Sequence, residues 1–264
     1  MTETNAIPLT TLFKGTIPKH PEFPEANEDK LRACDSRQMY IISDGASESY
    51  NSTLWAEIIV AAWYASPPRR RFSQWLRRAI AEYELRTNVA AMSWSQEAAF
   101  ERGSFASLLA INWHSQTLLR VTAVGDSEVL IVRDGEIKWA FPYDHADRFR
   151  ERPNLLSTIL GKNLGPFFRQ AIKAVLADRS DGPCHADVPL LELNDRMLCV
   201  TDALGEWLLR DSVDHKDRLS SVLNLTSDDE FSSLVENARL SGTMRRDDTT
   251  LLTLGLARNG IAHA

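Results

Sequence analysis

The sequence lacks the features that mark secreted, membrane-spanning or metal–thiolate proteins. It has only three cysteines among 264 residues, and no two of them have the spacing of a metal-binding pair. Such a sparse, odd set is typical of a reducing compartment. No apolar run approaches the ~18 residues of a membrane span, and no basic patch with a following apolar run marks a signal peptide. We therefore expect a cytoplasmic protein that does not contact a membrane.

An excess of positive charge is also missing. The formal net charge is -6 and the pI is about 5.6, which excludes a broad basic face for nucleic acid. The chain is 44% apolar and 25% charged, an ordinary globular composition, and is long enough to bury a large core. Because no repeat or linker interrupts it, we expect one domain over residues 1–264, with its core at about 25–257.

The first half of the chain predicts a strand and then helices. Residues 39–42 read as a strand entering a core, and apolar residues recur at helical spacing over 51–66. Asn51 or Ser52 can cap this helix. The "PP" that follows ends it, and the same spacing over 72–100 predicts a second helix.

From Phe105 the apolar period shortens to that of strands. "FASLLAINW", "TLLRVTAVG", "EVLIVRDG" and "EIKWAF" are short strands separated by turn residues, and Asp134-Gly135 is a hairpin signal. Strands joined by such short connections pair antiparallel.

The rest of the chain supplies an irregular insertion, two strands and a helix. Residues 141–187 read as a loop-rich, flap-like insertion, and strands return at 195–202 and 249–256. Ser227 and Glu230 form a capping box for the intervening helix. Two sheets between outer helices would bury all these apolar faces. The fold class is therefore predicted as α+β, a four-layer αββα sandwich of two antiparallel sheets flanked by helices.

Acidic residues stand where several of these strands meet loops. Five separate segments contribute them: Glu28 and Asp29, Asp44, Asp126, Asp202, and Asp247 beside Asp248. Each one alone also fits a helix cap or a turn. If the strand ends share one edge, the carboxylates would repel by ~1 kcal/mol or more per close pair, and cations would relieve that repulsion. An all-oxygen ligand set suits magnesium or manganese rather than zinc.

The motifs around these acids resemble those of a known family. In chain order they are "NED", "SDGAS", "GSFASLLA", "AVGDSEVLIVRDGEI", "DH", "LNDRMLCVTDALGEWL" and "RRDDTTLLTL". Together they are similar to the metal-dependent Ser/Thr protein phosphatases, the protein phosphatase 2C class of bacterial type. The resemblance covers about residues 25–257, and it implies the same sandwich of two antiparallel sheets.

The resemblance also implies roles for single residues. Asp44 would bridge two metal ions, with the Gly45 carbonyl on one of them. Asp202 and Asp247 would complete the shell of the other ion, so that these three aspartates form the catalytic set. The ions would be Mg2+ or Mn2+, two or three in number.

Three further acids would complete the metal centre. Glu28 and Asp29 would hold metal-bound waters or reach a metal, and Asp126 would serve a third ion together with Asp202. A water that bridges two ions would lose its proton near neutral pH and attack phosphorus in line. The resemblance therefore implies a hydrolase that removes phosphate from phosphoserine or phosphothreonine in a phosphoprotein, with a Ser/Thr kinase as a further partner by analogy.

The sequence departs from the family pattern at positions that contact phosphate or adjoin the ligands. Pro24 stands where the family has a phosphate-binding Arg, and the nearest bases are Lys19 and Lys30. The other departures are Ala46, Glu128 and Ala203. These changes support an alternative: a pseudophosphatase that binds a phosphoprotein or a kinase as a regulatory module without turnover.

Overall fold

The computed structural model describes residues 8–68, 72–113, 115, 118–164, 185–210 and 214–257. The part of the predicted insertion at 165–184 lies outside the described residues. Within the described part, no helix is both long and apolar enough to cross a membrane.

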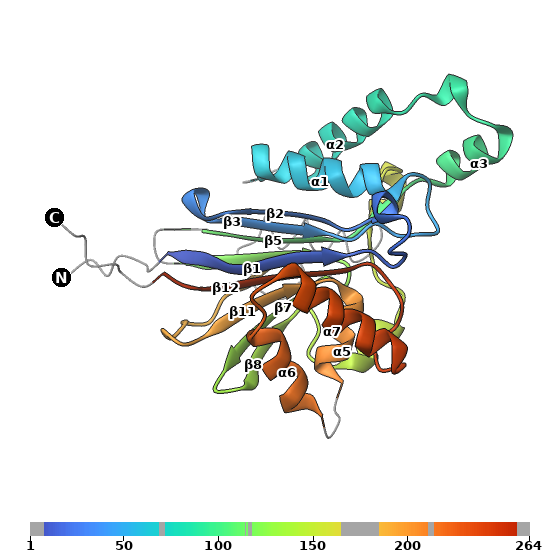
Figure 1. Cartoon of the computed structure of the whole chain (residues 1–264). Coiled ribbons are helices and arrows are strands. Elements are labelled where there is room, and N and C mark those ends of the chain that lie inside the picture. The colour runs from blue at the N-terminus through green and yellow to red at the C-terminus, as the bar shows by residue number, and fades with distance from the viewer. Residues whose placement is uncertain are drawn as a thin grey trace.

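Ten strands form two five-stranded sheets that lie face to face (Figure 1). One sheet has the order β10 (His185–Asp187), β6 (Leu119–Val124), β5 (Leu108–Trp113), β3 (Met39–Ser43), β2 (Lys30–Cys34). The other has the order β1 (Leu9–Ile17), β12 (Thr249–Leu256), β11 (Arg196–Val200), β7 (Glu128–Arg133), β8 (Glu136–Phe141). All their pairings are antiparallel. A short pair, β4 (Phe105–Ala106) and β9 (Leu156–Ser157), lies beside them.

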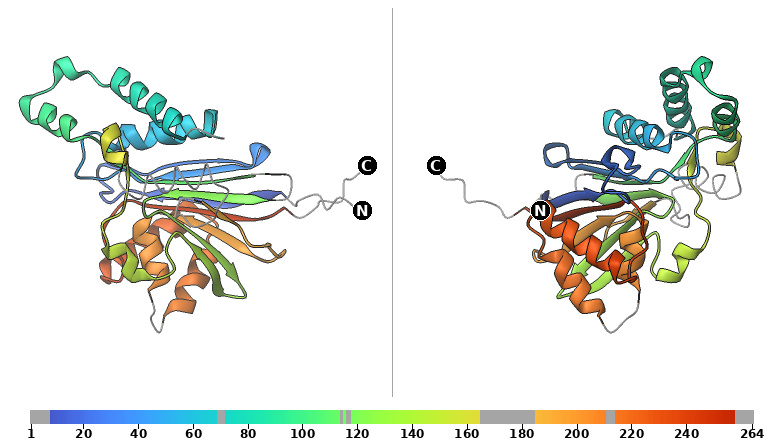
Figure 2. Two further views of the ribbon diagram at one scale, coloured as in Figure 1. Left: turned by 180° about the vertical axis from the view of Figure 1, so that it is seen from behind. Right: turned by 45° about the vertical axis from the view of Figure 1, so that its right-hand side comes forward.

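Helices cover both outer faces of this pair of sheets, and the views of Figures 1 and 2 agree on their placement. On the side of the β2–β3–β5 sheet, α1 (Ser52–Ala65) lies on the strands, α2 (Phe72–Arg86) packs against α1, and α3 (Trp94–Arg102) lies beyond them. Those against the other sheet are α5 (Asp202–Leu209), α6 (His215–Leu223) and α7 (Asp228–Leu240). Short 3-10 turns also occur in the described part of the chain: Pro24–Ala26, Asp35–Arg37, Val89–Ala91, Ala146–Arg150 and Leu160–Leu164. The predicted four-layer αββα architecture is confirmed.

Alternating side chains explain why the central strands are apolar on both faces. In β3, Tyr40 and Ile42 point into the core between the sheets, whereas Ile41 points to the helix layer and packs with Trp55 of α1. Because successive strand residues face opposite sides, a strand covered on both faces must be apolar throughout. β7 and β11 follow the same rule, so each sheet has one apolar face for the other sheet and one for helices.

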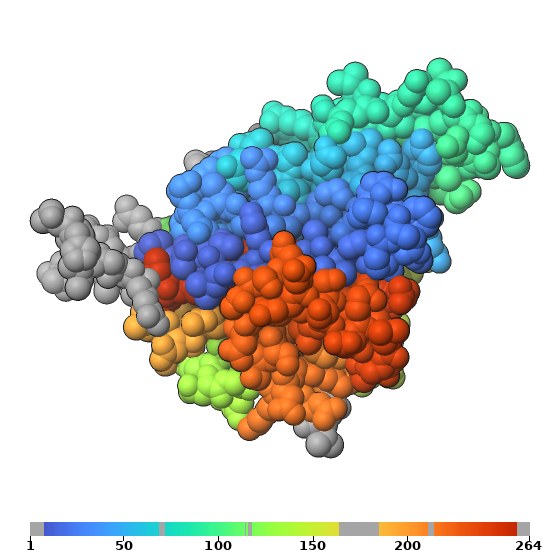
Figure 3. Space-filling model, viewed as in Figure 1, coloured from blue at the N-terminus to red at the C-terminus, as the bar shows by residue number. Residues whose placement is uncertain are grey.

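The end of α2 differs from the prediction. A single helix over 72–100 was expected, but α2 ends at Arg86 and α3 begins at Trp94. Ser93 and Gln96 make a full capping box, which starts a new helix and outweighs the continuing apolar spacing. The space-filling view shows the segment from α2 to α3 projecting from the body of the molecule (Figure 3).

The predicted caps meet different outcomes. Asn51 precedes α1 in the left-handed region but makes no side-chain cap bond, and Ser52 donates to Glu28 instead, so the predicted cap of α1 is wrong. At α7, Ser227 does accept from the Glu230 backbone, as a capping box requires. The Glu230 carboxylate, however, accepts from Thr226.

Candidate metal centre

Antiparallel pairing brings the acidic strand ends to one edge of the sandwich. Lys30, which follows Glu28 and Asp29, pairs with Ser43, which precedes Asp44. In the other sheet, Val200 pairs with the first residue of β7 and with Leu251 near the start of β12. The acid-bearing loops therefore all leave the same edge.

Asp44, Asp126 and Asp202 form a three-acid cluster at this edge. One carboxylate oxygen from each lies within 4.8 Å of the others. Asp44 follows β3, Asp126 follows β6, and Asp202 begins α5 after β11. Asp126 and Asp202 are buried and Asp44 is half-buried. Three carboxylates this close, largely out of water, form an unfavourable group unless a cation joins them.

The electrostatics of the cluster follow from this crowding. Burial raises the pKa of Asp44 well above its usual range, and the charges of Asp29, Asp126 and Asp247 add to the rise. Burial also raises the pKa of Asp126. The Arg245 guanidinium opposes both shifts, so its charge lies within reach of the cluster.

Asp29 lies beside the cluster and is fully buried. Its Oδ2 accepts hydrogen bonds from the Thr201 hydroxyl at 3.0 Å and the Thr250 hydroxyl at 2.7 Å. Burial is the main cause that raises the pKa of Asp29 to about 7, and the negative charge of Asp248 adds to it.

The donor set fits a divalent metal ion. Among the residues that the structure describes, the buried carboxylate oxygens without a hydrogen-bond donor are Asp29 Oδ1 and Asp202 Oδ1. An anionic oxygen buried without a partner is costly, and a cation would satisfy it. Carboxylates are ligands that Mg2+ and Mn2+ prefer.

A chain of serines fixes the turns that carry the cluster. The Asp44 backbone N–H donates to Ser107 Oγ at 2.9 Å, and Ser107 Oγ lies 2.7 Å from Ser127 Oγ. Gly45 is required by close approach, because a Cβ there would lie 2.9 Å from the Ser52 carbonyl oxygen. Gly125, before Asp126, has a φ of +98°, which favours glycine.

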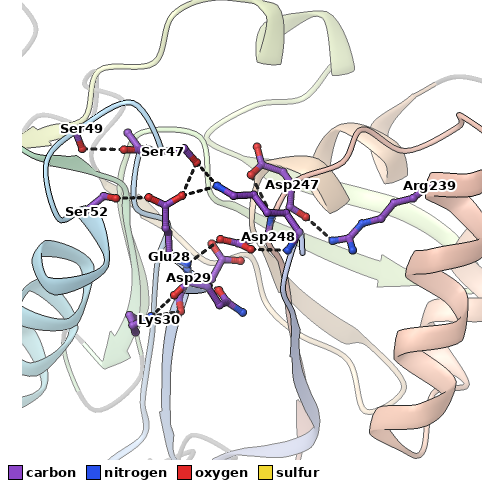
Figure 4. Close-up of polar contacts among 12 residues, drawn as sticks. Glu28, Asp29, Lys30, Ser47, Ser49, Ser52, Arg239, Asp247 and Asp248 are labelled. Atoms are coloured by element: carbon purple, nitrogen blue, oxygen red, sulfur yellow. Dashed lines mark hydrogen bonds and ion pairs between the residues drawn. The ribbon is translucent and has the colours of Figure 1, made fainter. Parts of the chain in front are cut away.

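Glu28 lies in a different environment, which we call the Glu28 network: Glu28, Lys19, Ser47 and Ser52. Figure 4 labels Glu28 and the two serines. The carboxylate accepts from the hydroxyls of Ser47 and Ser52, and from Lys19 Nζ at 2.7 Å. Lys19 Nζ also donates to Ser47 Oγ at 2.6 Å. Burial alone would lower the pKa of Lys19, but the hydrogen bond and charge of Glu28 raise it overall. Glu28 is thus satisfied by protein groups.

Asp247 and Asp248 link the segment that follows β1 to the segment that precedes β12. Asp248 accepts from the backbone N–H groups of Lys19 at 2.6 Å and Glu28 at 2.7 Å. Asp247 is half-buried, and its carbonyl oxygen accepts from Arg239 (Figure 4). The buried Arg239 side chain also donates to the Pro18 carbonyl at 3.0 Å, so it ties the end of β1 to the start of β12.

Two of the residues noted beside the family pattern can now be placed: the nearby base Lys30 and the departure Glu128. Lys30 Nζ donates to the backbone carbonyls of Asn27 at 2.6 Å and Asp29 at 3.0 Å. Glu128 is fully buried, accepts from the Tyr143 backbone N–H, and has its pKa raised well above the usual range by burial.

Sequence reasoning missed several residues of the site. Lys19 was noted only as a nearby base, and Arg245, Arg239 and Ser107 were not singled out. The basic pair before "DDTT" was a possible signal for Arg245, since charges next to an acidic turn tend to pair with it. No local pattern reports the other contacts, because their partners are distant in sequence.

Solved phosphatases share this fold. The serine/threonine phosphatase PstP of Mycobacterium tuberculosis matches with a TM-score of 0.58 and 16% identity, over 95% of this chain and 100% of that chain. The PstP catalytic domain in complex with 2 manganese ions gives 0.57 and 17%, over 95% and 99%. The PPM Ser-Thr phosphatase MsPP of Mycobacterium smegmatis in complex with cacodylate gives 0.52 and 19%, over 94% and 100%. No family model matches the sequence, and the search of curated proteins gave no significant match.

These matches define the class of fold. The chain has the fold of these serine/threonine phosphatases, which is the fold that the ordered motifs predicted.

Proposed function

We propose that this chain is a Mg2+- or Mn2+-dependent phosphatase that hydrolyses phosphoserine or phosphothreonine in proteins. The observation that carries the proposal is the three-acid cluster, together with the buried, unpartnered oxygens of Asp29 and Asp202. The fold shared with PstP, which was solved with manganese, supports the same assignment.

The predicted ligands keep their roles as proposals. Asp44, with the Gly45 carbonyl, Asp202 and Asp247 would hold two ions, and Asp126 would serve a third together with Asp202. Glu28 and Asp29 would hold metal-bound waters or reach a metal. The bound ions would lower the pKa of a bridging water and neutralise charge on the phosphoryl oxygens. The chain itself would fix the acids on rigid strand ends, through Ser107 and Arg239, so that little reorganisation accompanies the reaction. The cytoplasmic location and the kinase partner stay predictions from the sequence.

The first experiment measures turnover. The purified chain is assayed with MnCl2 on p-nitrophenyl phosphate and on a phosphothreonine peptide, beside Asp44→Asn and the surface control Asp229→Asn. We expect metal-dependent turnover in the wild type and in the control, and loss in Asp44→Asn. Wild-type turnover no higher than that of Asp44→Asn would refute the proposal.

A second candidate function rests on the protein cations already at the site. Lys19 satisfies Glu28, and Arg245 pairs with Asp202, which favours a pseudophosphatase that binds phosphoprotein without turnover. Calorimetry separates the two: bound Mn2+ and bound phosphopeptide without hydrolysis would identify the binding module.

A further inference from the structure

Arg245 is a charged group at the site to which the proposed reaction gives no role. Its guanidinium forms an ion pair with Asp202 Oδ2, while Oδ1 of the same carboxylate is buried without a partner. The Arg245 side chain is 37% exposed and that of Asp202 is 12% exposed. The guanidinium therefore lies at the boundary between the three-acid cluster and solvent.

The backbone on both sides of Arg245 is held in place. Met244 is buried in the core against the helices α5 to α7, and the Asp247 carbonyl is held by Arg239. Asp248 is fixed by the backbone N–H groups of Lys19 and Glu28. The Arg245 side chain is long and partly exposed, so it can change its partner while the backbone around it stays in place.

We propose that Arg245 binds the phosphoryl group of the substrate, and that it pairs with Asp202 only while no metal ion is bound. This inference rests on the proposed function. A divalent ion on Asp202 would neutralise the carboxylate and repel the guanidinium, which would release it at the mouth of the site. A planar guanidinium binds two oxygens of a phosphate side by side, so the released group would suit a phosphomonoester.

The other basic groups near the site are less suited to this role. Lys19 Nζ donates to the Glu28 carboxylate and to the Ser47 hydroxyl. Neither of these groups belongs to the three-acid cluster. Arg246 points elsewhere: it donates to the Lys19 carbonyl at 3.2 Å and lies 4.0 Å from Glu236. Arg246 is thus a matched control, next in sequence and equal in charge.

The proposal makes metal and phosphate binding dependent on each other. In the wild type, Mn2+ frees the guanidinium and so raises the affinity for phosphate beyond the direct attraction of the ion. Removal of Arg245 should have opposite effects on the two ligands. Mn2+ should bind more tightly, because no protein cation competes for Asp202, and phosphate should bind less tightly.

Isothermal calorimetry tests both effects with the whole chain. Mn2+ is titrated into wild type, Arg245→Gln, Arg245→Lys and Arg246→Gln, and inorganic phosphate is then titrated into each Mn2+-saturated protein. In Arg245→Gln we expect Mn2+ to bind several-fold more tightly and phosphate to bind about ten-fold or more weakly, the effect of one charge-assisted contact. Arg245→Lys should show a smaller loss of phosphate affinity, and Arg246→Gln should match the wild type.

Three outcomes would overturn the inference. Unchanged phosphate affinity in Arg245→Gln is the first. Parallel loss of Mn2+ and phosphate affinity is the second, because it would mean that Arg245 only supports the local structure. The third is loss of phosphate binding in Lys19→Met with none in Arg245→Gln.

The calorimetry tests the role of Arg245 independently of the proposed function, since it needs no turnover. An inactive wild type whose phosphate binding still depends on Arg245 would refute the phosphatase and keep the inference. An active wild type with unchanged phosphate binding in Arg245→Gln would do the reverse. In an active enzyme, Arg245→Gln should also raise KM for p-nitrophenyl phosphate more than it lowers kcat.

Discussion

The Glu28 network and the three-acid cluster lie at the same edge of the sandwich, yet their carboxylates differ in the partners that the protein gives them. Glu28 is satisfied by two hydroxyls and an ammonium group. The three-acid cluster has raised pKa values at Asp44 and Asp126 and an unpartnered oxygen on Asp202. The difference shows that acids at neighbouring strand ends can lie in very different environments. Whether the rest of the chain supplies hydrogen-bond donors to a carboxylate decides whether its oxygens still lack a partner that a cation could provide.

The largest expected effect is on metal affinity, and it separates the two groups directly. Asp44→Asn should weaken Mn2+ binding by about 100-fold or more, because it removes a carboxylate from the centre of the site. Glu28→Gln should weaken it by about ten-fold or less, because that carboxylate is already occupied. Calorimetry on both variants measures the contrast. Equal losses would mean that Glu28 exchanges its protein donors for the metal or its waters.

The same two variants should have opposite effects on the stability of the metal-free chain. Glu28→Gln should lower the free energy of unfolding by about 1–3 kcal/mol, because it removes the anion that accepts from Lys19, Ser47 and Ser52. Asp44→Asn should leave it unchanged or raise it, since one repelling charge is lost. Urea denaturation provides the measurement. A double variant with Lys19→Met should regain part of the loss, because the ammonium is no longer left without its partner.

A smaller effect is the pH dependence that Asp29 gives to the metal-free chain. Its pKa is about 7 in the folded protein, against about 4 for an unfolded chain, so the folded state holds an extra proton between these values. The free energy of unfolding should therefore fall as the pH rises from 5 to 8, by about 1–3 kcal/mol from this group.

Asp29→Asn should flatten this dependence, and saturating Mn2+ should flatten it in the wild type. Denaturation midpoints at pH 5, 6, 7 and 8 provide the test. A wild-type profile as flat as that of Asp29→Asn would show that the metal-free chain tolerates the buried charge.

The sequence predicted the sandwich because its signals are local. Alternating apolar residues mark each strand, and Asp134-Gly135 marks a hairpin turn in which both residues have positive φ. The acids at strand ends predicted one shared edge, and the structure places Asp44, Asp126 and Asp202 there.

What the sequence did not predict depends on partners that are distant in the chain. Ser52 seemed available as a helix cap, but its hydroxyl is used by Glu28, 24 residues earlier. Arg245 was one of many arginines until the fold brought it to Asp202. The break after Arg86 is the exception, because its signal, the capping box at Ser93, is local. The apolar period over 72–100 predicts a single helix instead.

The pairing of β1 with β12 has a consequence for biosynthesis. Lys19 and Asp248, which meet in a hydrogen bond, are separated by 229 positions. A ribosome therefore has to add Asp248, 229 positions after Lys19, before this corner of the protein can close, and contacts of such long range also form slowly. A nascent chain carries its acids apart, so the proposed metal centre can form only after β12 has paired with β1 and β11.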